Sequence, residues 1–172
     1  ALEAAVLGRA RVAQHSAGQL DAFGLSPRRY TVRRPRGGVL AVNFQPEAGT
    51  VSFSGPTHTL DWQPGVQDRL SWLVQLAAIV DADPARRVPG ARTRLDVVGP
   101  RGDWTSWVFE VVPDDPADPG AATPWLRLRR APAGPYDAQV EVWLDPAQHH
   151  LPARLRSDGP GPADAQTWVS AR

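Results

Sequence analysis

The sequence predicts a mainly β protein: a strongly curved antiparallel sheet, or a partly open β-barrel, with one amphipathic helix at about 66–80 packed on its concave side. Two patterns support this fold. Short runs of alternating polar and apolar residues recur between turns that contain Gly and Pro, as in an antiparallel meander. One long segment has helical spacing instead. The 172 residues suffice for a single β-rich domain, 1–172, with a buried core.

The helical segment follows Pro64-Gly65 and ends before Asp83-Pro84, because proline cannot continue the hydrogen-bond ladder. Asp68 is expected in the first helical turn, where a carboxylate meets free backbone N–H groups. The apolar face is wide, which predicts a helix covered on most sides. Its residues are Val66, Leu70, Trp72, Leu73, Val74, Leu76, Ala77, Ile79 and Val80. The remaining seam is polar or small: Asp68, Ser71, Gln75 and Ala78.

The strands follow from the alternation between turns. They are expected at 29–33, 39–44, 50–54, 57–62, 92–98, 104–112, 125–131, 136–145, 150–156 and 167–170. Near the N-terminus, turns are expected at Ala17-Gly18 and over residues 24–27. The acidic, Pro-rich stretch at 113–120 is expected to be a solvated loop and a candidate for local disorder.

The strand at 136–145 is assigned two faces. Tyr136, Ala138, Val140, Val142 and Leu144 alternate with Asp137, Gln139, Glu141 and Trp143, and the second set is typical of a solvent face. A hairpin closed by the turn at 132–135 would bring Arg129 near Asp137 and Arg127 near Gln139. The following hairpin would bring Arg154 towards Glu141.

The composition excludes several classes of function. Zero cysteines exclude disulfides, thiol catalysis and thiolate metal sites. The net charge of +1 gives no overall field that would attract nucleic acid, and all 19 positive charges are arginines. The chain starts at Ala1 and has no Met, so we expect that preceding residues were processed or removed. No apolar run in the sequence approaches the roughly 18 residues of a membrane span. We therefore expect any targeting segment to lie among those preceding residues.

Several separated motifs occur together. They are residues 24–30 (GLSPRRY), 65–76 (GVQDRLSWLVQL), Tyr136-Asp137, 141–146 (EVWLDP) and 151–155 (LPARL). In this order they resemble the domain-of-unknown-function 3108 family, over nearly the whole chain. The resemblance implies an exported, periplasmic protein of the Gram-negative cell envelope, in some members with a membrane tether upstream. It also implies that one or two N-terminal strands of the family domain are missing. An edge near Leu2 to Val12 would then be open to self-pairing. The family has no agreed activity, so it supplies no catalytic residues.

The candidate binding residues are Asp68, Arg69, Ser71, Trp72 and Gln75 in the helical segment, together with Trp143. Asp68 and Ser71 are three residues apart and so share a helix face. This polar group has two interpretations: it binds a ligand head group at the mouth of a cavity, or Asp68 caps the helix while Ser71 and Gln75 face solvent. A Ser–Asp pair without a placed histidine is not a nucleophile system.

Other reactive residue types suggest no further site. The four histidines lack metal-ligand spacing, and His149 and His150 are expected to be exposed turn residues; no metal or cofactor is predicted. The arginine-rich stretches at 28–36 and 127–130 are typical of a solvated face with ion pairs. Anionic lipid head groups and polysaccharide are the alternatives, and no nucleic-acid motif is present. Trp125 and Trp143 are expected either to stack a sugar or to pack on arginine stems.

Three functions remain open. The leading hypothesis is a non-enzymatic envelope protein that binds a hydrophobic or amphipathic ligand, such as a lipid or glycan, or a partner protein. The second is an interaction or assembly module of the envelope that uses an exposed strand edge. The third is a hydrolase with Asp and His residues in one cleft, although the spacing of these residues shows no such convergence.

Overall fold

The computed structural model describes residues 2–6, 12–34, 37–113, 124–135, 137–158 and 166–169, with the backbone alone described at 2–6 and 166–169. Most of the expected acidic loop at 113–120 and Tyr136 lie outside these residues. The chain divides into two compact units, residues 1–75 with 95–106 and residues 76–94 with 107–172. The helix α1 (Ser71–Ala82) and the strands β8 (Arg92–Val98) and β9 (Trp104–Val111) have residues in both units. The single-domain expectation stays a prediction.

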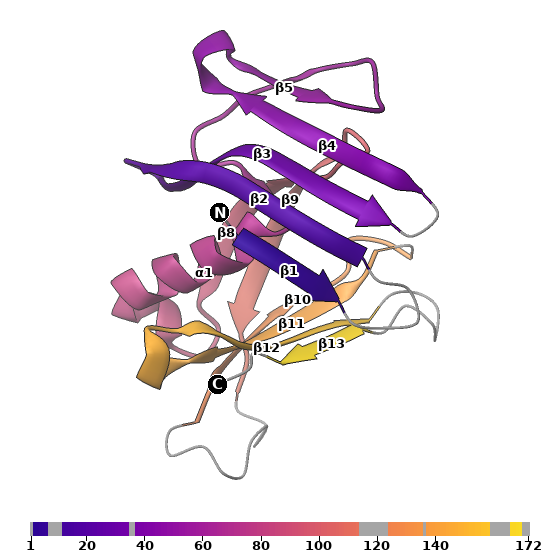
Figure 1. Cartoon of the computed structure of the whole chain (residues 1–172). Helices are drawn as coiled ribbons and strands as arrows, with labels where there is room; N and C mark the ends of the chain where they lie inside the picture. The colour runs from indigo at the N-terminus through magenta and orange to yellow at the C-terminus, as the bar shows by residue number, and fades with distance from the viewer. Residues whose placement is uncertain are drawn as a thin grey trace. The chain divides into compact units, whose positions relative to one another are not determined.

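The first unit contains a sheet with the strand order β1-β2-β3-β4-β5-β6 (Figure 1). Each strand pairs antiparallel with the next, and the sheet curls strongly, like half of a barrel. The strands are β1 (Leu2–Val6), β2 (Val12–Asp21), β3 (Gly24–Arg34), β4 (Gly38–Gln45), β5 (Thr50–Phe53) and β6 (Leu60–Asp61). A short 3-10 helix, Pro46–Ala48, connects β4 to β5. The predicted mainly β fold with a curved antiparallel sheet and one α-helix is confirmed.

The core of the first unit lies on one face of this sheet. Tyr30 in β3 is opposite Val42 in β4, and Val32 and Phe44 follow on the same face two residues along. The buried cluster consists of Tyr30, Val32, Val42, Phe44, Val51, Val66 and Val98. This face follows the alternation of the strands, because each strand contributes every second residue to it.

The other sheet has the strand order β13-β12-β11-β10-β9-β8-β7. The remaining elements are β7 (Gln67–Asp68), β10 (Leu126–Arg130), β11 (Gln139–Asp145), β12 (Leu151–Asp158), β13 (Gln166–Val169) and the 3-10 helices Pro84–Arg87 and Pro146–Gln148. The strands from β9 to β13 pair antiparallel, whereas β7 pairs with β8 in parallel. Val111, Leu128 and Val142 lie in register on the buried face of this sheet. No described helix is long and apolar enough to cross a membrane.

The helix starts later than expected. It begins at Ser71, not near Val66, because Gln67 and Asp68 pair as a strand with Val97 and Val98. The expected position of Asp68 in the first helical turn is wrong, since it lies in β7. Its side chain still accepts hydrogen bonds from the Leu70 and Ser71 N–H groups at the start of the helix, as expected of a cap. The expected solvent exposure of Ser71 and Gln75 is wrong, since both are buried.

The turns near the N-terminus also differ from the expectation. Ala17 and Gly18 lie within β2 at a shift in register, and the hairpin reverses at residues 22–23, so that residues 24–27 belong to β3. A glycine inside a strand often marks a bulge or a close backbone approach. Both apply here: a Cβ atom on Gly18 would lie 2.2 Å from the carbonyl oxygen of Ser26.

We therefore expect Gly18→Ala to lower the free energy of unfolding by about 1 to 3 kcal/mol, since the added methyl group meets fixed backbone. The matched control is Gly55→Ala, whose Cβ would meet only Leu40 at 3.8 Å, an ordinary van der Waals contact. Urea unfolding followed by circular dichroism measures both. Equal stabilities for the two variants would contradict the bulge as described.

The hairpin between β10 and β11 has a different register from the expected one. Arg127 is opposite Trp143 and Arg129 is opposite Glu141, because β11 begins only at Gln139 and the connecting loop is longer than a tight turn. Arg154 is opposite Trp143, not Glu141. The expected solvent face is wrong as well, since Glu141 and Trp143 are both buried.

Candidate ligand pocket at the start of the helix

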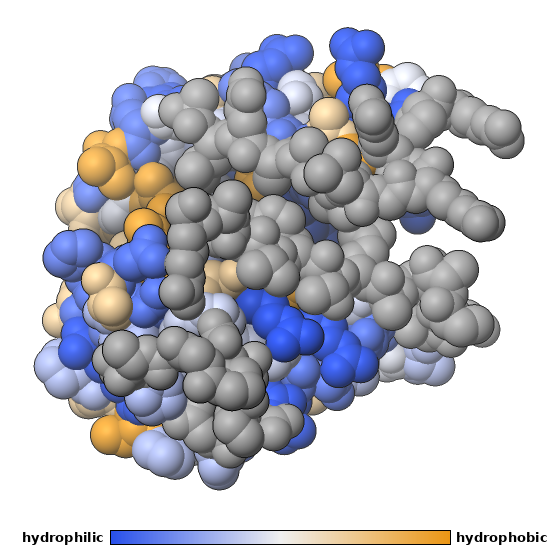
Figure 2. Space-filling model, turned by 60° about the horizontal axis from the view of Figure 1, so that its bottom comes forward, coloured by the Kyte–Doolittle hydropathy of each residue, from blue (hydrophilic) through white to orange (hydrophobic). Residues whose placement is uncertain are grey.

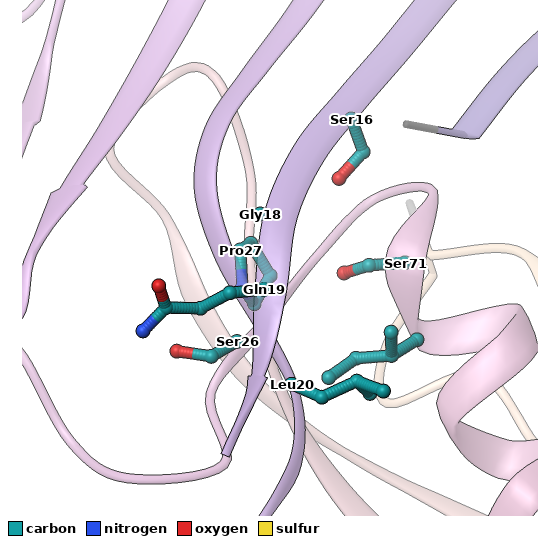
Figure 3. Close-up of a pocket in the computed structure, with 8 residues that line it drawn as sticks. Ser16, Gly18, Gln19, Leu20, Ser26, Pro27 and Ser71 are labelled. Atoms are coloured by element: carbon teal, nitrogen blue, oxygen red, sulfur yellow. The ribbon is translucent and has the colours of Figure 1, made fainter.

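An open cavity of about 160 Å³ lies in the first unit, where the β2–β3 hairpin meets the start of α1. Figure 3 shows Ser71 at the start of the helix with its hydroxyl group directed towards β2, and Leu20 extending from β2 towards the helix. The lining residues are Ser16, Gly18, Gln19, Leu20, Leu25, Ser26, Pro27 and Ser71. The bulge at Gly18 brings the β2 backbone against Ser26 and so shapes the cavity wall.

The buried carboxylate of Asp68 supports this wall. Its Oδ2 accepts a hydrogen bond from Ser16 Oγ at 2.5 Å, and its Oδ1 accepts from the backbone N–H groups of Leu70 and Ser71, each at 2.8 Å. The Asp68 N–H in turn donates to Ser71 Oγ at 3.0 Å. Asp68 is 0% exposed. The network thus fixes β2, through Ser16, to the start of the helix, through Ser71.

Burial raises the pKa of Asp68, while the hydrogen bonds from Ser16, Ser71 and Leu70 act in the opposite direction. Burial also raises the pKa of the nearby Tyr30 phenol, with a smaller contribution from the Asp68 charge. Tyr30 donates to Gln14 Oε1 at 2.6 Å and remains neutral at physiological pH. The Asp68 carboxylate is thus held by the Ser16 hydroxyl group and by two backbone N–H groups, which order the start of the helix.

Two glutamines hold the β2–β3 hairpin in position. Gln75 Oε1 accepts from the Leu25 N–H at 2.8 Å, and Gln75 Nε2 donates to the Phe23 carbonyl at 2.9 Å. Gln67 Nε2 donates to the Leu25 carbonyl at 2.7 Å. Both backbone polar groups of Leu25 are therefore fixed by side chains from the segment around the helix start. The result is a cavity wall with a defined shape.

The sequence-predicted site residues have different roles. Asp68, Arg69, Ser71, Trp72 and Gln75 gather at the start of the helix, but only Ser71 lines the cavity. Asp68 and Gln75 support its wall, Trp72 is buried, and Arg69 forms an ion pair with Asp103. Trp143 belongs to the second unit, where it packs on arginine side chains. This is the second of the two interpretations given for it, the first being a surface that stacks a sugar.

Sequence reasoning missed the residues that the hairpin contributes to the cavity, foremost Ser16, Leu25 and Ser26. The residue in the sequence that could have indicated this hairpin is Gly18. It interrupts an otherwise continuous strand pattern, and a glycine in that position indicates a bulge as readily as a turn. Interpreted as a bulge, it would have joined residues 12–21 into one strand paired with β3, with Ser16 opposite Tyr30 and Gln19 opposite Ser26.

In the second unit, one histidine differs from the expectation. His149 is exposed, as expected, but His150 is buried and its Nδ1 lies 2.8 Å from Asp81 Oδ1. This hydrogen bond holds the pKa of Asp81 below its usual range. His149 and His150 both have positive φ angles, 51° and 54°. Among the described residues no group of three or more His, Cys, Asp or Glu side chains could hold a metal ion.

Comparisons with known proteins found no match for the chain among protein-family profiles, curated proteins or solved structures.

Proposed function

We propose that the chain is a non-enzymatic protein of the bacterial cell envelope that binds one end of a small amphipathic ligand in the cavity between β2, β3 and α1. The mixed lining of this cavity carries the proposal. Three serines, Ser16, Ser26 and Ser71, line the cavity together with the apolar residues Leu20, Leu25 and Pro27. A few convergent polar groups on an apolar surface are typical of small-molecule sites.

The size of the cavity supports a partly enclosed ligand. Its volume of about 160 Å³ is below the roughly 300–1,000 Å³ of sites that enclose a whole drug-sized molecule. The rest of the ligand would therefore lie outside. Leu20 and Phe23 provide an apolar surface there, since they are 75% and 59% exposed. A head group with hydroxyl groups would sit at the serines and a short apolar chain along the hairpin tip.

The compartment in this proposal rests on the family resemblance. A periplasmic protein of a Gram-negative envelope would meet lipids and glycans as its available ligands. Both classes combine hydroxyl-rich head groups with apolar or flat carbon surfaces. The ligand class thus agrees with the lining of the cavity and with the expected compartment.

We expect Leu20→Ser to weaken the binding of octyl glucoside, below its critical micelle concentration, by about threefold to tenfold, since an exposed leucine contributes about 1 kcal/mol of apolar contact. The measurement is an NMR titration that follows the amide signals of Leu25 and Ser26, which line the cavity. Octyl glucoside is uncharged, so the titration reports on the polar and apolar contacts alone.

Leu151→Ser is the matched control, because Leu151 is also an exposed leucine, at 48%, but lies on β12 in the second unit. It should leave the titration unchanged. Amide signals of the hairpin that do not move with octyl glucoside, or an equal effect of both variants, would contradict the proposed site.

An assembly module is the second candidate. In the described part of the chain β1 forms the outer end of the first sheet and pairs only with β2. An edge strand exposes unpaired N–H and C=O groups that a second copy or another chain can take up. Absence of octyl glucoside binding, combined with self-association that increases with protein concentration, would favour this candidate.

A further inference from the structure

The second unit has a cluster of arginines on one face of its sheet that the proposed ligand pocket does not use. Arg127 and Arg129 on β10 flank β11 on one side, and Arg154 and Arg156 on β12 flank it on the other. The registers align Arg127, Trp143 and Arg154 in one row and Arg129, Glu141 and Arg156 in the next. We call these four arginines the arginine face.

Trp143 orders one row of the arginine face. The guanidinium carbon of Arg127 lies 5.4 Å from the centre of the Trp143 ring, and that of Arg154 lies 4.8 Å from it. Such contacts are attractive because the ring face carries negative charge. Trp143 is only 5% exposed. The indole therefore does not itself offer a stacking surface, and instead it holds two cationic side chains in a defined orientation.

The charges within this face are unevenly balanced. Arg127 pairs with Glu141 at 2.6 Å, and Arg156 pairs with Asp158 at 2.8 Å. Glu110, across from Arg129 on β9, is already bound by Arg92 at 2.9 Å. Within the described ranges neither Arg129 nor Arg154 forms an ion pair, and Arg154 Nε is buried without a hydrogen-bond partner. Two guanidinium charges are thus left for an external anion.

The spacing allows a single ligand to reach both charges. Arg129 and Arg154 lie two strands apart and two residues apart along the strands, which separates their Cα atoms by about 12 Å. Long side chains from these positions can approach one anion above β11. Hydrophilic residues gather in clusters on the side of the molecule seen in Figure 2, and hydrophobic ones occur there in small groups.

We propose that the arginine face binds a phosphomonoester group. A phosphomonoester carries close to two negative charges at neutral pH, which matches the two guanidinium groups without an internal ion pair. The planar fork of arginine donates two parallel hydrogen bonds to phosphate oxygens, and Trp143 keeps one such fork oriented. The group belongs either to a lipid head group or to a soluble phosphorylated compound.

The test compares two phosphomonoester probes: glycerol 3-phosphate, by titration calorimetry, and phosphatidic acid in phosphatidylcholine vesicles, by co-sedimentation. Arg129→Gln/Arg154→Gln should weaken binding at least about tenfold, since two charge-assisted contacts are lost. Arg129→Gln alone should weaken it less, and it leaves the Trp143 contacts intact. The control Arg33→Gln/Arg101→Gln makes the same change in net charge at exposed arginines of the first unit.

Binding of both probes that depends on the arginine face supports the proposal for phosphate from either source. If only the binding of vesicles depends on the arginine face, the phosphate belongs to a lipid. If only the binding of glycerol 3-phosphate depends on it, the phosphate belongs to a soluble compound. The proposal is overturned if neither probe binds, or if the control weakens binding as much as the Arg129→Gln/Arg154→Gln variant. Octyl glucoside carries no phosphate, so its titration tests the pocket alone. The outcome for the arginine face is therefore independent of the outcome for the proposed function.

Discussion

Asp68→Ala is expected to lower the free energy of unfolding by about 3 to 5 kcal/mol, because it removes a buried charged acceptor and leaves its donors without partners. The Ser16 hydroxyl and the Leu70 and Ser71 N–H groups all donate to this carboxylate. The substitution also removes the cap of α1. Urea unfolding followed by circular dichroism measures the loss.

Asp61→Ala is the control, since Asp61 is an exposed residue on β6. It should change the free energy of unfolding by less than about 0.5 kcal/mol. Asp68→Asn keeps an oxygen that can accept from the two N–H groups, so its loss should be smaller than that of Asp68→Ala. Similar stability for Asp68→Ala and Asp61→Ala would show that the network does not hold the helix start.

The same carboxyl group should give a specific pH dependence. Burial raises the pKa of Asp68 in the folded protein above the roughly 3.9 of an unfolded chain, so the folded state binds the proton more tightly. Its contribution to stability is complete below the unfolded pKa and is lost as the pH rises through the native pKa. The stability of the wild type relative to Asp68→Asn should therefore fall as the pH rises above the roughly 3.9 of the unfolded chain.

The difference between the two proteins is the quantity to measure, because other carboxyl groups act oppositely. A hydrogen bond with His150 lowers the pKa of Asp81, and one from Arg28 lowers the pKa of Glu47. The stabilisation from these two carboxylates is lost as the pH falls. It is the same in the wild type and in Asp68→Asn, so it cancels in the difference between their free energies of unfolding. A wild-type advantage that grows with rising pH would contradict the raised pKa of Asp68.

Trp143→Ala has the second large expected effect, a loss of about 3 to 5 kcal/mol, typical of removing a buried aromatic side chain. The indole is 5% exposed and supports the guanidinium groups of Arg127 and Arg154. The substitution leaves a cavity and also releases both arginines. Thermal and urea unfolding measure the loss.

Trp143→Phe separates packing from hydrogen bonding. Trp143 Nε1 has no hydrogen-bond partner in the described part of the chain, so phenylalanine loses area but no bond. We expect a loss of about 1 to 2 kcal/mol and retention of part of the cation–π contact. A loss as large as that of Trp143→Ala would contradict the absence of a partner for the indole N–H.

The positions of most strands were predictable because alternation and turn residues act locally. The expected strand at 92–98 agrees with β8 to the residue, and the one at 104–112 differs from β9 only at its end. Register was not predictable. The β10–β11 hairpin has a longer loop than Pro132–Pro135 suggested, and this shift brought Trp143 rather than Gln139 opposite Arg127.

The candidate site was only partly predictable for a similar reason. Asp68 and Ser71 are close in sequence, so their contact follows from local capping geometry. Ser16 is 52 residues from Asp68 and reaches it only because the bulge at Gly18 and the hairpin set the position of β2. The burial of Gln75 was not predictable for the same reason: its hydrogen-bond partners, the backbone groups of Phe23 and Leu25, lie in a hairpin that is distant in the sequence.

Native mass spectrometry of the protein purified from the envelope of the cells that make it is the most direct test of ligand binding in the cavity. We expect a copurifying amphipathic lipid or glycan that leaves on denaturation, retained by Leu151→Ser and depleted in Leu20→Ser. A wild-type protein that carries no small molecule, or one whose bound molecule is unaffected by Leu20→Ser, would contradict binding in the cavity.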